Sequence, residues 1–171
     1  MKIILETERL ILRELTAEDA ANFYRLNQDH EVVKYTGDVP FSDIEEARQF
    51  LLKYDQYKKY RVGRWAVVRK SDNVFLGWCG LKYHPQTNEY DLGFRFFRKY
   101  WNQRYATESA KACLKYGFNE LHLDSILGHA MKANLASVKV LEKIGMRFDR
   151  TTDFEGQEGV LFTIFQNDFS Q

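Results

Sequence analysis

Cysteine and proline are scarce in this chain of 171 residues, with two of each. Cys79 and Cys113 stand far apart in the sequence, without a CxxC pair or a histidine at metal-ligand spacing, so we expect neither a disulfide framework nor a metal site. We interpret both cysteines as small buried hydrophobic residues. Because Pro40 and Pro85 mark no linker, we expect one domain over residues 1–171.

Long apolar runs and a charge excess are also missing. No run approaches the ~18 residues that a membrane span needs, and the start MKIILETERL has no signal-peptide core, so we expect a cytoplasmic protein without a membrane partner. The 25 Lys and Arg residues are balanced by 24 Asp and Glu residues, which leaves a formal net charge of +1. Since no global field would attract a polyanion, we expect no nucleic-acid partner.

Apolar residues, which make up 44% of the chain, are present in sufficient number for one filled core. Residues 10–12 are predicted to form a strand. Thr16 and Asp19 resemble a capping box that opens a helix to about residue 26, and Ser42 and Glu45 resemble a second box that opens a helix to about residue 58. The first third of the chain is therefore predicted to be a strand followed by two helices.

The rest of the chain alternates between strand-like and helix-like patterns. The predicted elements, in order, are strands at 64–69, 74–83 and 89–97, a helix at 103–118, a strand at 125–130, a helix at 134–144, and strands at 147–152 and 158–166. Polar turns join the first three of these strands, which predicts an antiparallel meander.

The order of these elements predicts an α/β (α+β) fold with one mixed, mostly antiparallel sheet of about seven strands. The helix at 103–118 connects two strands that should lie side by side, and such a crossover predicts at least one parallel pair. Helices should cover both faces of the sheet.

Two segments, 91–110 and 129–146, have the pattern of a strand, a short loop and the start of a helix. A helix N-terminus offers unpaired backbone N–H groups and a partial positive charge, which suit a phosphate-bearing ligand. An ordinary strand-to-helix connection explains the same pattern, so the pattern alone does not identify a site.

The residues of these segments resemble the acetyl-CoA-binding motifs of the GNAT N-acetyltransferases, through DLGFRFFRKYWNQRYATESA and NLASVKVLEKIGM. The opening TERLILR is similar to the first strand of the branch that includes the ribosomal-protein N-terminal acetyltransferases. The resemblance implies a GNAT-like fold, acetyl-CoA as co-substrate, and direct attack of a primary amine through a tetrahedral intermediate. A degenerate GNAT domain that binds acyl-CoA or a protein partner without turnover is the alternative, and either form is expected to be a monomer or a homodimer.

The resemblance also places the cofactor contacts. It assigns backbone contacts to Phe94, Arg95 and Phe96, and a phosphate loop to Asn102, Gln103, Arg104, Tyr105, Ala106 and Thr107. Asn102 and Arg104 stand where the family commonly has glycine, which tolerates positive φ; asparagine partly imitates this freedom and arginine tolerates such φ poorly. The Arg104 guanidinium, however, would lie near the expected pyrophosphate and offer a charge-assisted contact.

Catalytic roles follow from the same comparison. Asp91 matches the family's strand glutamate and is the first candidate for general base, through a water, with Glu89 in reserve; a solvated strand carboxylate is the alternative. Asn134 is expected to cap its helix, to face the cofactor, or both. Leu141 stands where many members have a tyrosine that protonates the departing thiolate, so Ser137 is the candidate for that role.

The acceptor is constrained by proton chemistry. An α-amino group titrates near ~7.8 and a lysine near ~10.4, so a weak or water-relayed base favours an N-terminal or small-molecule α-amine, with polyamines and antibiotics still open. The acceptor site should come from residues 26–62, whose aromatic residues line a pocket or simply pack: Tyr35, Phe41, Tyr54, Tyr57 and Tyr60. We interpret four histidines as surface or satisfied residues: His30, His84, His122 and His129.

Overall fold

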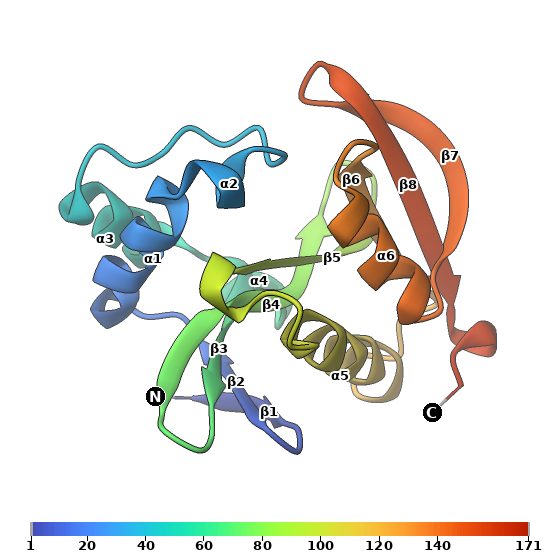
Figure 1. Ribbon diagram of the computed structural model, residues 1–171. Coiled ribbons are helices and arrows are strands. Elements are labelled where there is room, and N and C mark those ends of the chain that lie inside the picture. Colours follow the sequence, from blue (N-terminus) through green and yellow to red (C-terminus); the bar gives the residue numbers. More distant parts are fainter. Residues whose placement is uncertain (1, 171) are drawn as a thin grey trace.

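One sheet of eight strands forms the framework of the computed structural model, which describes residues 2–170 (Figure 1). The strands lie in the order β1-β2-β3-β4-β5-β6-β8-β7. Their bounds are β1 Ile3–Glu6, β2 Leu10–Glu14, β3 Arg64–Arg69, β4 Val74–His84, β5 Glu89–Phe96, β6 Ser125–Met131, β7 Arg147–Phe154 and β8 Gln157–Phe165. The predicted mixed, mostly antiparallel fold is confirmed. The strand that was not predicted is β1, a four-residue segment too short to show a clear alternation.

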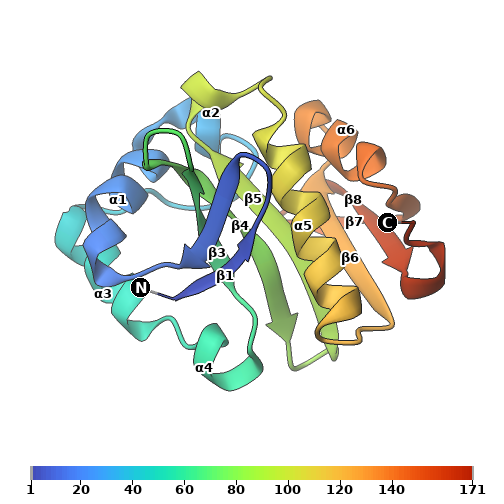
Figure 2. The same cartoon turned by 90° about the horizontal axis from the view of Figure 1, so that it is seen from below.

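Helices cover both faces of this sheet. Their bounds are η1 Ala17–Asp19, α1 Ala20–Gln28, α2 His30–Val33, α3 Ile44–Lys53, α4 Gln56–Tyr60, η2 Arg98–Tyr100, α5 Tyr105–Asn119, α6 Leu135–Lys143 and η3 Gln166–Asp168. Figure 2 shows α5 lying along β5 and β6, with α1 and α3 at the opposite side of the molecule. None of the helices described here combines the length and the apolar character needed to cross a membrane.

Two apolar clusters hold the layers together. The larger one joins the sheet to α5 and α6, with Leu81, Leu114 and Phe118 at most 1% exposed. The smaller one joins the sheet to α1 and α3. Cys79 of β4 and Cys113 of α5 are fully buried in the larger cluster with their Sγ atoms 3.7 Å apart, which confirms their interpretation as buried residues.

The predicted helix from Ser42 to about residue 58 is wrong in two respects. Asp43, not Ser42, caps α3 by accepting a hydrogen bond from the Glu46 N–H at 2.8 Å. The helix then stops at Lys53, because Tyr54 adopts an extended conformation in which its hydroxyl accepts a hydrogen bond from the Arg64 N–H at 2.9 Å. A tertiary contact therefore overrides the local helical pattern. The short helix α2 was not predicted at all.

The parallel pair that positions the site is formed by β5 and β6, which α5 connects as predicted. Its paired residues are Asp91 with Leu127 and Leu92 with Gly128. Beyond Leu92, β5 continues for four residues without a partner in β6, and the two strands diverge (Figure 1). The sheet therefore has an opening at its centre.

Candidate functional site

The opening between β5 and β6 exposes backbone polar groups. Residues 93–96 of β5 pair with β4 on one side, for example Phe94 with Cys79 and Phe96 with Gly77, but are not paired with β6 on the other. The Phe96 carbonyl has a partner, since it accepts a hydrogen bond from Trp101 Nε1 at 2.9 Å. Backbone N–H and C=O groups of an extended strand need partners. A ligand with amide groups of its own that lies between the two strands would supply them.

Next to this opening, α5 begins with an unusual backbone. Asn102 and Arg104 have φ values of 60° and 66°, in the left-handed region. Arg104 takes the conformation usual for glycine, which arginine tolerates poorly, at a cost of about 1–2 kcal/mol. Arg104 occupies the N-cap position without a side-chain capping bond within residues 2–170, so the first-turn N–H groups of α5 remain available to an anion.

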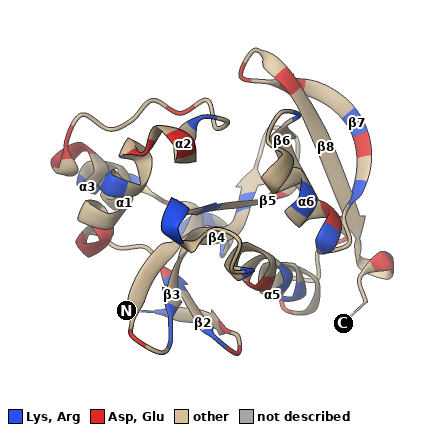
Figure 3. Cartoon of the chain, in the orientation of Figure 1, with Lys and Arg blue, Asp and Glu red and all other residues tan. Residues whose placement is uncertain are grey.

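The surroundings of this helix start are basic. Figure 3 shows Lys and Arg gathered at η2, which carries Arg98 and Lys99. Asn102, Gln103 and Arg104 are exposed. The negative charge of Glu108, the acidic residue of the first turn, is balanced by Arg9. Its carboxylate accepts hydrogen bonds from Arg9 Nε at 2.7 Å and from the Thr7 hydroxyl at 2.5 Å.

Four further residues of the predicted phosphate loop and strand are less accessible. The Tyr105 side chain is buried beneath the Arg9 guanidinium, 4.5 Å from its ring centre, and Phe96 is 5% exposed. Ala106 and Thr107 are half-buried. Tyr105 and Phe96 therefore have only their backbone groups to offer a cofactor.

A cleft of about 530 Å³ contains most of the other predicted residues. Its walls come from α1, the connection between α2 and α3, α3, the strands β3 to β6, α6 and the tip of the β7–β8 hairpin. It brings together Asp91, Phe94, Arg95, Asn134 and Ser137. Glu89, Phe96 and the 102–107 loop are not among the residues that line it.

Asp91 is held in an ion pair inside this cleft. Its carboxylate lies 2.8 Å from Arg64 Nη2 and 3.4 Å from His84 Nε2. Burial alone would raise the pKa of Asp91, but the positive Arg64 guanidinium and the His84 hydrogen bond outweigh burial and hold this pKa at about 2. The carboxylate is therefore ionised at neutral pH and is a weak base by itself.

Three residues of α6 face the same cleft. Asn134 is the N-cap, and its Oδ1 accepts a hydrogen bond from the Ser137 N–H at 3.3 Å, so the predicted capping role is present. Leu141 is buried and packs against Gly128 of β6, where a Cβ atom would come within 2.7 Å of it. Of these three side chains, only Asn134 and Ser137 carry a polar group.

Of the five aromatic residues expected near the acceptor, Tyr35, Phe41 and Tyr54 line the cleft. The other two are used for packing. The Tyr57 hydroxyl accepts a hydrogen bond from the Leu15 N–H and donates one to the Arg64 carbonyl, while Tyr60 packs on Tyr83.

Arg64, Trp78 and His129 are among the cleft residues that sequence reasoning missed. Arg64 begins a strand that is apolar only in its centre, which is a weak signal. For His129 the expectation of a surface or satisfied residue is wrong, because its Nε2 is buried without a hydrogen-bond partner in the described part of the chain. Burial also lowers the pKa of His129, which favours the neutral imidazole.

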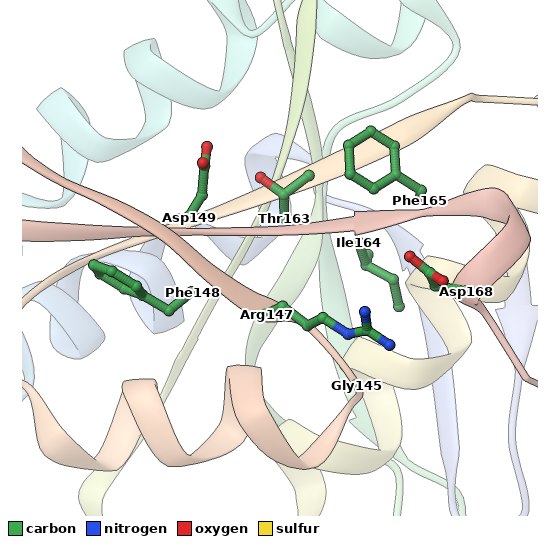
Figure 4. Close-up of a pocket in the computed structure, with 8 residues that line it drawn as sticks. All are labelled: Gly145, Arg147, Phe148, Asp149, Thr163, Ile164, Phe165 and Asp168. Carbon is green, nitrogen blue, oxygen red and sulfur yellow. The ribbon is translucent and has the colours of Figure 1, made fainter.

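A second hollow, of about 200 Å³, lies between α6, β7, β8 and η3 (Figure 4). It contains none of the predicted site residues. Figure 4 shows Asp149 and Thr163 projecting to one side of the strands and Ile164 to the other. The chemistry that the sequence predicts is concentrated in the large cleft instead.

The opening beside β5, the available N-terminus of α5 and the large cleft are together typical of a group-transfer enzyme that uses a phosphate-bearing carrier. The chain belongs to the GNAT acetyltransferase family, since the family model described as an acetyltransferase (GNAT) domain matches residues 9–147. It is an acetyl-CoA-dependent acetyltransferase.

Individual relatives agree with this assignment. The chain is 31% identical over 143 residues to the uncharacterised N-acetyltransferase YnaD of Bacillus subtilis (strain 168). The aligned region covers 84% of this chain and 82% of YnaD. A GNAT-family acetyltransferase structure from Bacillus anthracis is 28% identical, with a TM-score of 0.83 and coverage of 98% and 99% of the two chains. The spermidine N-acetyltransferase of Vibrio cholerae, solved with CoA and spermine, shares the fold at 18% identity and a TM-score of 0.80, covering 95% and 98%.

Proposed function

We propose that this acetyltransferase transfers the acetyl group of acetyl-CoA to a primary α-amine, either a protein N-terminus or a small molecule. The observation that carries the proposal is the unpaired edge of β5, which has an available helix N-terminus at one end and a substrate-sized cleft beside it. This arrangement suits a long cofactor with amide groups and a pyrophosphate. The solved structures that share the fold include a ribosomal-protein-serine acetyltransferase and a spermidine N-acetyltransferase, so the proposal covers both protein and small-molecule acceptors.

In this proposal, three groups of residues bind the cofactor. The backbone at 93–96 binds the pantetheine arm, and its N–H groups stabilise the carbonyl oxygen as negative charge develops there. The phosphate loop, from Asn102 to Thr107, binds the pyrophosphate through backbone N–H groups and the Arg104 guanidinium. Asn134 and Ser137 flank the cofactor from α6.

Proton transfers complete the reaction. The amine nitrogen bonds to the carbonyl carbon, the carbon–sulfur bond breaks, and the proton lost by nitrogen passes to Asp91 through a water, with Glu89 as the reserve base. Ser137 donates a hydrogen bond to the departing thiolate, because Leu141 has no proton to give. A carboxylate with a pKa of about 2 is suited to an amine that is already partly deprotonated near neutral pH, and this favours an α-amine over lysine.

A degenerate GNAT domain that binds acyl-CoA or a partner protein without turnover is the second candidate. It is favoured by Arg104 in place of glycine and Leu141 in place of a proton donor. In both cases we propose that residues 1–171 act as one domain, as a monomer or a homodimer.

Acetyl-CoA is expected to bind to the isolated protein with measurable heat. Binding to the native state alone also stabilises the fold, by about 2.7 kcal/mol at a ligand concentration of 100 times the Kd, and so raises the melting temperature. Isothermal calorimetry and a thermal melt measure both quantities, and turnover is then followed as thiol release with a panel of amines. Binding without thiol release would favour the degenerate domain, and the absence of heat and stabilisation would reject acetyl-CoA as the ligand.

Ser137→Ala is expected to lower kcat and leave the pH dependence of kcat/KM unshifted, because the hydroxyl assists the departing thiolate and not the amine. The loss should be about 5- to 10-fold, the value of one ordinary hydrogen bond. Ser71→Ala, in an exposed turn, is the matched control. A kcat equal to that of the wild type would remove Ser137 from the mechanism.

A further inference from the structure

Two guanidinium groups flank one indole ring at the floor of the cleft. The Cζ atoms of Arg64 and Arg95 lie 5.5 Å and 5.2 Å from the centre of the Trp78 ring. Their side chains are 17% and 10% exposed. Two cations so close together and so poorly hydrated need anionic partners.

The partners of the two arginines differ in kind. Arg64 is matched by Asp91 on the sheet itself, at 2.8 Å, and also donates to the Gly80 carbonyl at 2.7 Å. Arg95 has one fixed partner, the buried Asn27, whose Oδ1 accepts a hydrogen bond at 2.6 Å. An amide orients the guanidinium but does not neutralise its charge.

The carboxylate that pairs with Arg95 comes from the surface. Asp38 lies in the connection between α2 and α3, outside any helix or strand, and its Oδ2 is 2.5 Å from Arg95 Nη2. The Asp38 side chain is 55% exposed, whereas the Arg95 side chain is almost fully enclosed. A carboxylate therefore reaches from a surface loop down to a buried cation, and a ligand entering the cleft could take its place.

A second, independent observation concerns Trp78. This residue lines the cleft, and its Nε1–H is buried without an acceptor anywhere in residues 2–170. A buried donor without a partner costs about 1–3 kcal/mol, and an acceptor that displaced the side chains covering this atom would recover this energy. Next to the Arg95 guanidinium, the ligand group that meets both requirements is an anionic acceptor.

We propose that Arg95, supported by Asn27 and Trp78, is the binding site for a carboxylate of the acceptor, and that the acceptor is a small amino-acid-like amine. In the free enzyme, Asp38 holds the place of that carboxylate. This inference rests on the proposed function.

The charge pattern along β5 fits such an acceptor. Asp91, Gly93 and Arg95 are every second residue of β5, so they face the same side of the sheet. The Asp91 carboxylate and the Arg95 guanidinium therefore lie on either side of Gly93, roughly 6.6 Å away in each direction at 3.3 Å per residue. The Arg64 guanidinium lies over Gly93 between them. A molecule with an amine and a carboxylate fits this order when its carboxylate lies at the guanidinium groups and its amine lies towards Asp91, whereas a polyamine carries only the charge that Arg64 and Arg95 repel.

An aromatic cluster in another wall of the cleft would contact the rest of the acceptor. Phe23, Phe41 and Phe50 form an aromatic cluster with ring centres 5.6 to 5.7 Å apart, and all three line the cleft. Phe50 is 46% exposed. An apolar side chain such as that of phenylalanine would cover this surface.

The experiment compares phenylalanine with phenylalaninamide, in which a neutral amide replaces the carboxylate. Both acceptors are tested with the wild type, Arg95→Gln and the control Arg150→Gln, whose exposed arginine pairs with Asp149. Arg95→Gln is expected to lower kcat/KM for phenylalanine about 10- to 100-fold, through KM, because a charge-assisted hydrogen bond is lost. The value for the amide should change less than about threefold. The ratio between the two substrates, compared across variants, cancels their different amine basicities.

Asp38→Asn removes the internal carboxylate from an exposed loop and so tests the same site without disturbing the floor of the cleft. It is expected to lower KM for phenylalanine several-fold and leave the amide unaffected. Two results would overturn the carboxylate site while leaving acetyl transfer intact. One is an equal loss of kcat/KM for both substrates in Arg95→Gln, and the other is a wild-type preference for a polyamine or a peptide amide. No transfer to any amine would instead overturn the proposed function.

Discussion

Asp91→Asn is expected to lower kcat/KM about 100-fold or more, with acetyl-CoA affinity nearly unchanged. In the proposed mechanism the carboxylate lies where the attacking nitrogen gains positive charge, and its removal leaves the Arg64 guanidinium without its partner at 2.8 Å. Both changes disfavour the transition state. Steady-state kinetics with a fixed acceptor measures the loss, and Asp149→Asn, which removes an exposed carboxylate paired with Arg150, is the control.

A double variant separates the two ways in which Asp91 can act. If Asp91 receives the proton, Asp91→Asn combined with Arg64→Gln stays as inactive as Asp91→Asn alone. If Asp91 only balances the charge of Arg64, the double variant recovers most of the activity because the site is neutral again. Full turnover in Asp91→Asn alone would leave Glu89 or an ordered water as the base.

The low pKa of Asp91 also fixes the pH dependence of these measurements. The carboxylate is ionised above pH ~2, so the acidic limb of kcat/KM should follow the amine, near ~7.8 for an α-amine, in the wild type and the variant. The same shift stabilises the fold. A folded pKa of about 2 against ~3.9 in the unfolded chain contributes about 2.6 kcal/mol, fully present above pH ~4 and lost as the pH falls towards 2.

Local patterns predicted the elements around the proposed cofactor site. The strands β3, β4 and β5, the helix α5 and the parallel pair followed from periodicity, turn residues and the crossover between two strands. These signals are local or nearly so, and therefore readable from one sequence. Asn102 and Arg104 also take the left-handed backbone that the motif requires, although neither is glycine.

The acceptor side could not be predicted in the same way, because its contacts join distant residues. Arg95 meets Asn27 across 68 positions, and Arg64 meets Asp91 across 27. Such pairs depend on strand register and on where α1 packs, which composition and spacing do not determine. The end of the helix before Tyr54 also depends on a tertiary contact, because the Tyr54 hydroxyl accepts a hydrogen bond from the Arg64 N–H.

Arg104 is expected to bind the pyrophosphate through its guanidinium, so Arg104→Ala should weaken acetyl-CoA binding by about one to two decades. The side chain is exposed at the N-terminus of α5, beside the basic η2 segment, where an anion would meet it. Calorimetry with acetyl-CoA measures the change. Arg150→Ala, which removes an exposed arginine from β7, is the control for the loss of one positive charge.

Glycine at the same position separates the role of the side chain from that of the backbone. Arg104 has a φ of 66°, which is strained for arginine and for alanine but not for glycine. Arg104→Gly should therefore lose the same affinity as Arg104→Ala, while its free energy of unfolding without ligand is about 1 kcal/mol higher than that of the alanine variant. Asn102→Gly relieves similar backbone strain without changing the charge, so it should keep the wild-type affinity. If Arg104→Ala binds acetyl-CoA as tightly as the wild type, the guanidinium points to solvent and the loop holds the pyrophosphate through its backbone alone.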